Sequence, residues 1–114
     1  MRITFTARHF KTSGQLKDFA TTEVTRLKKY YDDIIDVDII LDYVKQDKVA
    51  EIVVKVFGQK IAVVEKSEDM YKSITLAVNK LERKLVKYKE KLRHFDKERI
   101  TENIETEIET EEEE

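Results

Sequence analysis

Residues 36–65, DVDIILDYVKQDKVAEIVVKVFGQKIAVVE, decide the fold of this chain. The run that opens this stretch has two faces, with Val37, Ile39, Leu41 and Tyr43 on one side and Asp36, Asp38 and Asp42 on the other. A period of two is typical of a half-buried β-strand. A polar turn at Lys45–Lys48 then leads into a β-rich run over Val49–Phe57. Gly58-Gln59 predicts a hairpin turn into a third strand, Lys60–Glu65. Three consecutive strands therefore occupy the middle of the chain.

Three further elements flank these strands. Residues Arg2–Arg8 also alternate, which predicts a strand at the N-terminus. Ser13 can cap a helix whose apolar residues recur in steps of three and four; they are Leu16, Phe19, Ala20, Val24, Leu27 and Tyr31. A second helix is expected from about Asp69 to Phe95, with its apolar stripe at Met70, Ile74, Ala77, Val78, Leu81, Leu85, Tyr88 and Leu92.

The order of elements is therefore β-α-β-β-β-α. Each helix has one apolar face and the strands mostly alternate, so packing both helices on one face of a sheet buries all the apolar surface. The sequence predicts an α+β fold in which two helices cover one face of a four-stranded sheet.

The charge is divided unevenly along the 114 residues. Residues 98–114 hold nine glutamates and one arginine, a formal charge of −8, whereas residues 1–97 carry 21 basic and 15 acidic residues, or +6. A basic body suggests a polyanionic partner. We expect a folded domain over residues 1–97 and an acidic tail over residues 98–114.

Two interpretations of the tail remain open. Ile100, Ile104 and Ile108 recur every four residues and could form a weak helical stripe. Repulsion among the glutamates favours disorder instead. Because the tail follows the basic residues of the last helix so closely, it could fold back and screen them. Deleting residues 101–114 is then expected to strengthen nonspecific RNA binding at low salt.

Composition excludes several classes of protein. The chain has no cysteine, so it has no disulfide framework and no thiolate nucleophile or ligand. It has no apolar run long enough to span a membrane and no recognisable signal peptide, and we expect a cytoplasmic protein. With two glycines and two histidines it shows no phosphate-binding loop or catalytic motif, so we expect no enzyme activity, small-molecule substrate or cofactor.

The positive charge is concentrated in the last helix. At 100° per residue, Lys80, Lys84, Lys87 and Lys91 fall on one flank beside the apolar stripe, with Arg83 at its edge. The helix places Glu82 and Glu90 elsewhere, although a solvated helix face usually mixes both signs. A one-sided row about 16 Å long suits a phosphate backbone, because each neutralised phosphate releases a counterion. We therefore predict a nucleic-acid contact along this flank.

Other polar clusters carry weaker hypotheses. Lys28 could extend the basic surface if the two helices lie side by side, and Arg8 could add a hydrogen-bonding edge after the first strand. Five aspartates could in principle hold a divalent cation, but they lack EF-hand spacing, so solvated residues are the preferred interpretation and no metal site is predicted; they are Asp32, Asp33, Asp36, Asp38 and Asp42.

The sequence also resembles a known family. The segment Asp69-Met70-Tyr71, followed by Ile74 and the run KLERKLVKYKEK at residues 80–91, is similar to the motif of ribosome hibernation promoting factors and the related ribosome-associated inhibitor. Ile3-Thr4-Phe5 with Arg8-His9, the segment at residues 27–31 and the order of elements match as well. The resemblance covers about residues 1–95.

The resemblance implies a layout related to double-stranded RNA-binding domains. It also implies binding to 16S rRNA in the decoding channel of the small ribosomal subunit, alone or within the 70S ribosome, where it blocks messenger and A- and P-site transfer RNAs. The basic helix positions of the family carry over onto Lys80, Arg83, Lys87, Lys89 and Lys91. Lys84 and Lys28 are added from helical geometry alone.

The chain departs from the family's long and short forms. It has no room for the separate C-terminal dimerisation domain of long members, so we expect a monomer off the ribosome. Its acidic tail is like that of the inhibitor type, where the tail is associated with preventing 100S ribosome dimers. A general double-stranded RNA module and an adaptor for an acidic protein remain as alternatives.

Overall fold

The computed structural model describes the backbone of residues 1–101 and the side chains of residues 1–93. The expectations for the acidic tail concern residues that lie largely outside this range. The elements in chain order are β1 (Arg2–Arg8), α1 (Gly14–Thr25), the 3₁₀ helix η1 (Arg26–Lys29), β2 (Asp36–Val44), β3 (Asp47–Val56), β4 (Gln59–Ser67) and α2 (Met70–Thr101). The predicted order β-α-β-β-β-α is confirmed.

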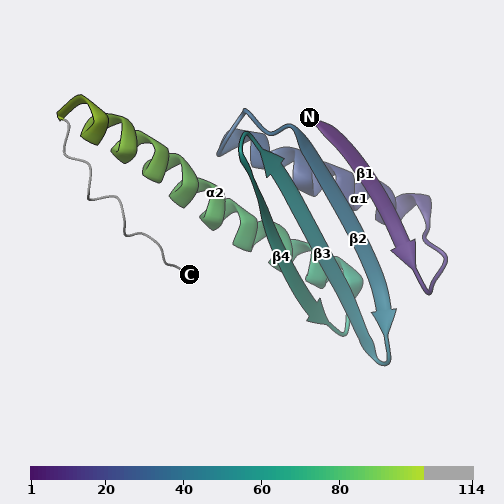
Figure 1. The fold of residues 1–114 in the computed structure, drawn as a ribbon. Helices are drawn as coiled ribbons and strands as arrows, with labels where there is room; N and C mark the ends of the chain where they lie inside the picture. The colour runs from purple at the N-terminus through teal and green to yellow at the C-terminus, as the bar shows by residue number, and fades with distance from the viewer. Residues whose placement is uncertain (102–114) are drawn as a thin grey trace.

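The four strands form one mixed sheet in the order β1-β2-β3-β4 (Figure 1). The pair β1 and β2 is parallel, and the other two pairs are antiparallel. A parallel pair needs a crossover, which α1 supplies. Both helices lie behind the sheet in Figure 1, so they cover one face and leave the other open. The predicted α+β layers are therefore confirmed, with β1 and β4 at the two edges.

The core lies between the helices and the sheet. The alternation predicted for β2 places Val37, Ile39 and Leu41 on the helix side, where all three are fully buried. They belong to the same buried cluster as fully buried residues of α2 such as Leu81 and Leu85. Burying this apolar surface is the main force that holds the layers together.

The helix starts follow from local hydrogen bonds. The Ser13 side chain accepts a hydrogen bond from the Leu16 backbone N–H at 3.1 Å, as the predicted cap requires. At the start of α2 the buried Ser73 Oγ donates to the Lys48 carbonyl at 2.6 Å. It also lies 2.7 Å from Ser67 Oγ. These bonds fix the start of α2 against β3 and the end of β4.

Several expected boundaries were wrong by a few residues. The β2–β3 turn contains only Lys45-Gln46, because Lys45 adopts φ +58° and the chain reverses at once. The β3–β4 turn is Phe57-Gly58 rather than Gly58-Gln59, since Gly58 adopts φ +84° and Val56 pairs directly with Gln59. The first α-helix ends at Thr25 and continues as η1. The last helix runs to Thr101 rather than Phe95.

Candidate nucleic-acid interface

Four lysines of α2 lie together on the side of the helix that faces β4. We call Lys80, Lys84, Lys87 and Lys91 the basic flank. Two contacts establish its position: Lys80 Nζ lies 3.4 Å from Glu65 Oε2, and Lys84 Nζ lies 3.5 Å from the Ala62 carbonyl oxygen, both in β4. All four residues are exposed. The helix geometry thus brings these predicted residues together, and Arg83 is exposed beside them.

The basic flank is not purely positive, because a carboxylate from another element lies beside one of its lysines. Glu65 comes from β4, where alternation places it on the helix side of the sheet and within reach of Lys80. Among the residues whose side chains are described, Lys87 and Lys91 have no carboxylate within 4 Å. The pattern of α2 could not predict Glu65, because this residue belongs to another element and reaches Lys80 only through its position in β4.

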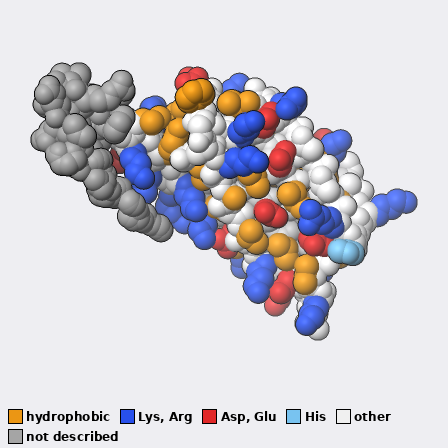
Figure 2. All heavy atoms as spheres, in the orientation of Figure 1, with side chains coloured by type: hydrophobic (Ala, Val, Ile, Leu, Met, Phe, Trp, Pro, Cys, Tyr) orange, Lys and Arg blue, Asp and Glu red, His pale blue; other side chains and the backbone are white. Residues whose placement is uncertain are grey.

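Three basic residues with described side chains, Lys89, Lys91 and Arg93, lie on the part of α2 that extends past the sheet, beyond the contact of Tyr88 with the Phe57 carbonyl. Figure 1 shows that the helix projects well beyond the β3–β4 turn, and Figure 2 shows Lys and Arg side chains gathered along that projection. The open face of the sheet, which is turned toward the viewer in Figure 2, carries both signs interspersed. The projecting helix is therefore the better surface for a polyanion.

Lys89 lies on the side of α2 opposite the basic flank, and Lys28 lies on η1, which packs against that side. Lys89 follows Glu82 by seven residues, or two helical turns, so both point to the same side. That side faces α1 and η1, because Arg26 Nη2 lies 3.8 Å from Glu82 Oε2. Lys28 belongs to η1. The predicted set thus divides into the basic flank beside β4 and a second group beside η1.

Arg8 is separated from both groups. It ends β1, the edge strand farthest from β4, and its side chain lies on the open face of the sheet. The next residue, His9, adopts φ +65°, and its Nδ1 lies 2.8 Å from Asp42 Oδ1. The structure therefore does not bring Arg8 into the helical basic surface.

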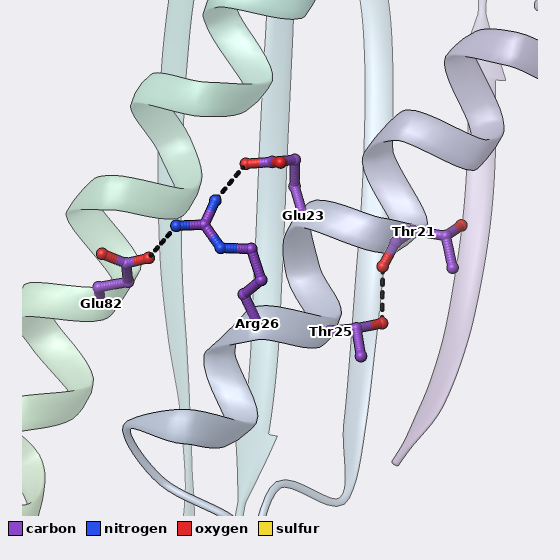
Figure 3. A network of polar contacts seen from close by, with 5 residues as sticks. All are labelled: Thr21, Glu23, Thr25, Arg26 and Glu82. Atoms are coloured by element: carbon purple, nitrogen blue, oxygen red, sulfur yellow. Dashed lines mark hydrogen bonds and ion pairs between the residues drawn. The ribbon is translucent and has the colours of Figure 1, made fainter.

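Arg26 links the two helices (Figure 3). Its Nη1 donates to Glu23 Oε1 at 2.9 Å, and its Nη2 faces the Glu82 carboxylate at 3.8 Å. Glu82 Oε2 is buried and accepts no hydrogen bond from the described residues, so the Arg26 charge is its main compensation. The pair holds the Glu82 carboxylate toward α1, away from the basic flank.

Replacing Arg26 with alanine is expected to destabilise the protein by about 1 kcal/mol, because a partly buried carboxylate loses its counter-charge. The double variant Arg26→Ala/Glu82→Gln should recover part of this loss, since the neutral amide needs no counterion. Urea unfolding of the wild type, both single variants and the double variant measures the coupling. Strictly additive losses would contradict a functional Arg26–Glu82 pair.

The aromatic residues pair with each other. Tyr31 meets Tyr88 edge to face with ring centroids 5.4 Å apart, and Phe19 meets Tyr71 in the same way at 4.9 Å. Burial, and then the neighbouring Tyr88 and Asp33, raise the pKa of Tyr31 above its ordinary value of 10.0. Within the described side chains the tyrosines thus act as packing contacts between elements, and they do not form a row on which bases could stack.

Two of the five clustered aspartates contact basic side chains. Asp36 accepts hydrogen bonds from Arg2 at 3.1 and 3.4 Å, and Asp42 contacts His9. No cluster of three or more potential metal ligands occurs within residues 1–93. Nor does any helix of the described chain have the length and apolarity needed to cross a membrane. These groups add no competing site to the basic surface.

Residues 3–93 match the family model described as Sigma 54 modulation protein / S30EA ribosomal protein. The ribosome hibernation promoting factor of Azotobacter vinelandii is 30% identical over 91 residues, which cover 80% of this chain and 85% of that protein. The factor of the same name from Escherichia coli K12 is 29% identical over 93 residues, covering 82% and 98%.

Solved structures share the fold. A ribosomal subunit interface protein from Coxiella burnetii superposes with a TM-score of 0.74 at 32% identity, covering 78% of this chain and 98% of that one. The N-terminal domain of Protein Y from Thermus thermophilus superposes with a TM-score of 0.70 at 24% identity, covering 77% and 99%. The second likeness concerns the fold alone.

Proposed function

Because this chain belongs to the Sigma 54 modulation protein / S30EA ribosomal protein family, the family of the ribosome hibernation promoting factors, we propose that it binds the small ribosomal subunit and inhibits translation. Hibernation factors of this family are not enzymes. The proposed mechanism is occupancy: the protein fills the decoding channel against 16S rRNA, and messenger and A- and P-site transfer RNAs cannot enter. A protein similar over most of this chain is described as a ribosomal subunit interface protein, which supports that location.

The basic flank is the observation that supports rRNA as the ligand. Lys80 to Lys91 span about 16 Å along α2, which is enough to follow several phosphates. Lys87 and Lys91 flank Tyr88, whose contact with the Phe57 carbonyl marks the end of the sheet at the β3–β4 turn. A phosphate backbone can therefore approach them where α2 projects past the sheet (Figure 1). Lys89, on the opposite side of the same projection, and Lys28 would contact a second strand of RNA. The projecting helix could therefore be inserted between two RNA segments.

The proposed ribosome-binding domain comprises residues 1–97, with residues 98–114 as an acidic tail. The boundary falls inside α2, which runs to Thr101, so it marks a change of charge rather than the end of an element. The match to the family model ends at residue 93, which supports a ribosome-binding domain of about this length. We propose that the body is a monomer off the ribosome and needs no cofactor.

Comparing the affinity for intact 30S subunits with that for naked duplex RNA tests this function against a general RNA module. A hibernation factor should prefer the subunit by at least about a hundredfold at the same salt concentration, because phosphate contacts alone give only nonspecific affinity. Equal affinities would favour the general module. Nuclease treatment of a pull-down from lysate addresses the adaptor alternative, since an acidic protein partner would survive it.

A further inference from the structure

Among the residues that the structure describes, no strand pairs with the outer edge of β4. The carbonyl of Lys55 accepts a hydrogen bond from Ile35 at 2.9 Å, on the β2 side, so it faces away from β4. Lys55 and its partner Lys60 are therefore a non-hydrogen-bonded pair of the β3–β4 ladder. It follows that every second residue of β4 directs its backbone N–H and C=O outward; these residues are Lys60, Ala62, Val64 and Lys66. The contact of Lys84 Nζ with the Ala62 carbonyl agrees with this orientation.

The two sides of this edge have different chemistry. On the open side of the sheet lie the exposed residues Lys60, Ala62, Val64 and Lys66, and Val64 is 55% exposed. On the helix side lies the basic flank, which approaches β4 through Lys80 and Lys84. An extended segment suited to this edge would carry carboxylates toward the basic flank, and β-branched and acidic residues on the open side, where two lysines lie beside Ala62 and Val64. Such an edge is a template for an added strand.

The acidic tail has this pattern. Residues 104–111, IETEIETE, alternate strictly between β-branched residues and glutamates. Isoleucine and threonine favour strands, and the period of two places all four glutamates of this run on one face. We propose that the tail adds to the edge of β4 as a fifth strand, with Glu109 and Glu111 against the basic flank and Ile108 and Thr110 on the open side, beside Lys60 and Ala62.

The chain connection allows this arrangement. The strand β4 runs parallel to β1, and α1 and α2 lie on the same face of the sheet. A tail that returns from the end of α2 and runs along β4 is parallel to it and forms a β4-α2-β5 crossover. The new strand would lie on the side of β4 away from β3, which is the same direction across the sheet as from β1 to β2. The β4-α2-β5 crossover would therefore have the same hand as the β1-α1-β2 crossover, as parallel crossovers in one sheet generally do.

The length of the tail is sufficient. Tyr88 Oη donates to the Phe57 carbonyl at 3.3 Å, which places Tyr88 level with the β3–β4 turn. From Tyr88 to Thr101 the helix extends about 20 Å, a distance that six extended residues can cover on the return. Residues 108–114 can then lie beside Lys60–Lys66. In that register Glu109 and Glu111 face Lys87 and Lys84, and Glu113 lies beside Glu65 and Lys80. Ile108 and Thr110 lie beside Lys60 and Ala62 on the open side, where Glu112 and Glu114 follow beside Val64 and Lys66.

The added strand would make RNA binding competitive with the tail. This consequence rests on the proposed function, because the same lysines would have to bind either the glutamates or rRNA phosphates. On the ribosome the many nearby phosphates would displace the tail strand from the lysines. Isolated RNA at low concentration would compete poorly with the tail for the same lysines. The tail would thus suppress nonspecific RNA binding more than ribosome binding.

Amide hydrogen exchange followed by NMR on the full chain tests the strand directly. The matched control is a full-length variant in which residues 104–111 are reordered to Ile-Ile-Thr-Thr-Glu-Glu-Glu-Glu, with composition and charge unchanged. The outward N–H groups of Lys60, Ala62, Val64 and Lys66 should exchange about tenfold or more faster in the reordered variant, because ladder hydrogen bonds exchange only on opening. Equal exchange rates in the wild type and the reordered variant would overturn the proposal, because charge screening by the tail does not depend on the order of its residues. Helical chemical shifts for residues 104–111 in the wild type would overturn it as well.

A second variant examines the edge itself. Val64→Pro removes one outward N–H and no hydrogen bond to β3, a substitution that edge strands tolerate. It should speed exchange at Ala62 and Lys66 while the N–H groups of Ile61 and Val63, which face β3, stay protected. Protection of Ala62 and Lys66 that persists in this variant, or that rises with protein concentration, would contradict docking of the chain's own tail. Ribosome binding is measured separately, and its absence with the exchange result intact would refute only the proposed function.

Discussion

Ribosome binding is expected to fall by more than about a hundredfold when Lys80, Lys87 and Lys91 are all replaced by glutamate, because three attractions to phosphate become three repulsions. The dependence of log affinity on log salt should also become shallower by about 3, since each lost phosphate contact removes nearly one released counterion. Affinities for 30S subunits, measured at several salt concentrations, give both quantities. The fold should survive, because the exposed pair between Lys80 and Glu65 contributes at most about 1 kcal/mol.

The control is a second triple variant with the same change of charge away from the flank. Lys11, Lys45 and Lys55 are exposed and lie in a loop, in the β2–β3 turn and on the open face of the sheet. Their replacement by glutamate should reduce the affinity less than about tenfold, through the long-range field alone. Equal losses in the two variants would show that net charge, rather than the basic flank, determines binding.

Leu81→Ala is expected to destabilise the fold by about 3 kcal/mol, because the substitution leaves a cavity between α2 and the sheet. Leu81 is fully buried, whereas Leu76 on the same helix is 37% exposed and provides a matched control. Leu76→Ala should cost less than about 1 kcal/mol, since a partly exposed side chain leaves no closed cavity. Urea midpoints at constant m-value report both effects. Similar losses for the two variants would contradict the orientation of α2.

The fold was predictable because the hydrophobic periods are unambiguous. Alternation through β2 and steps of three and four through α2 specify which side chains are buried. The buried set confirms them except toward the ends of the two stripes, where Tyr43 is 37% and Leu92 40% exposed. The boundaries were harder, because they depend on single backbone conformations. Lys45 and Gly58 reverse the chain at positive φ, and no period reports that. The parallel pairing of β1 with β2 depends on the crossover by α1, which local sequence does not reveal.

The candidate site was predictable only where one helix determines it. Lys80, Lys84, Lys87 and Lys91 share a side by helical geometry alone, and the structure places them together. Glu65 reaches Lys80 from another element, so its role depends on strand register. Similarly, the separation of Lys28 from the flank depends on where η1 packs, and that of Arg8 on its position at the far edge of the sheet.

Cosedimentation with ribosomal subunits tests the central claim most directly. The full chain is mixed with 30S subunits in magnesium-containing buffer at moderate salt and separated on a sucrose gradient. We expect the wild-type protein to migrate with the 30S peak and the Lys80/Lys87/Lys91 glutamate variant to stay at the top. A wild-type protein that also remains at the top of the gradient would contradict binding to the small subunit.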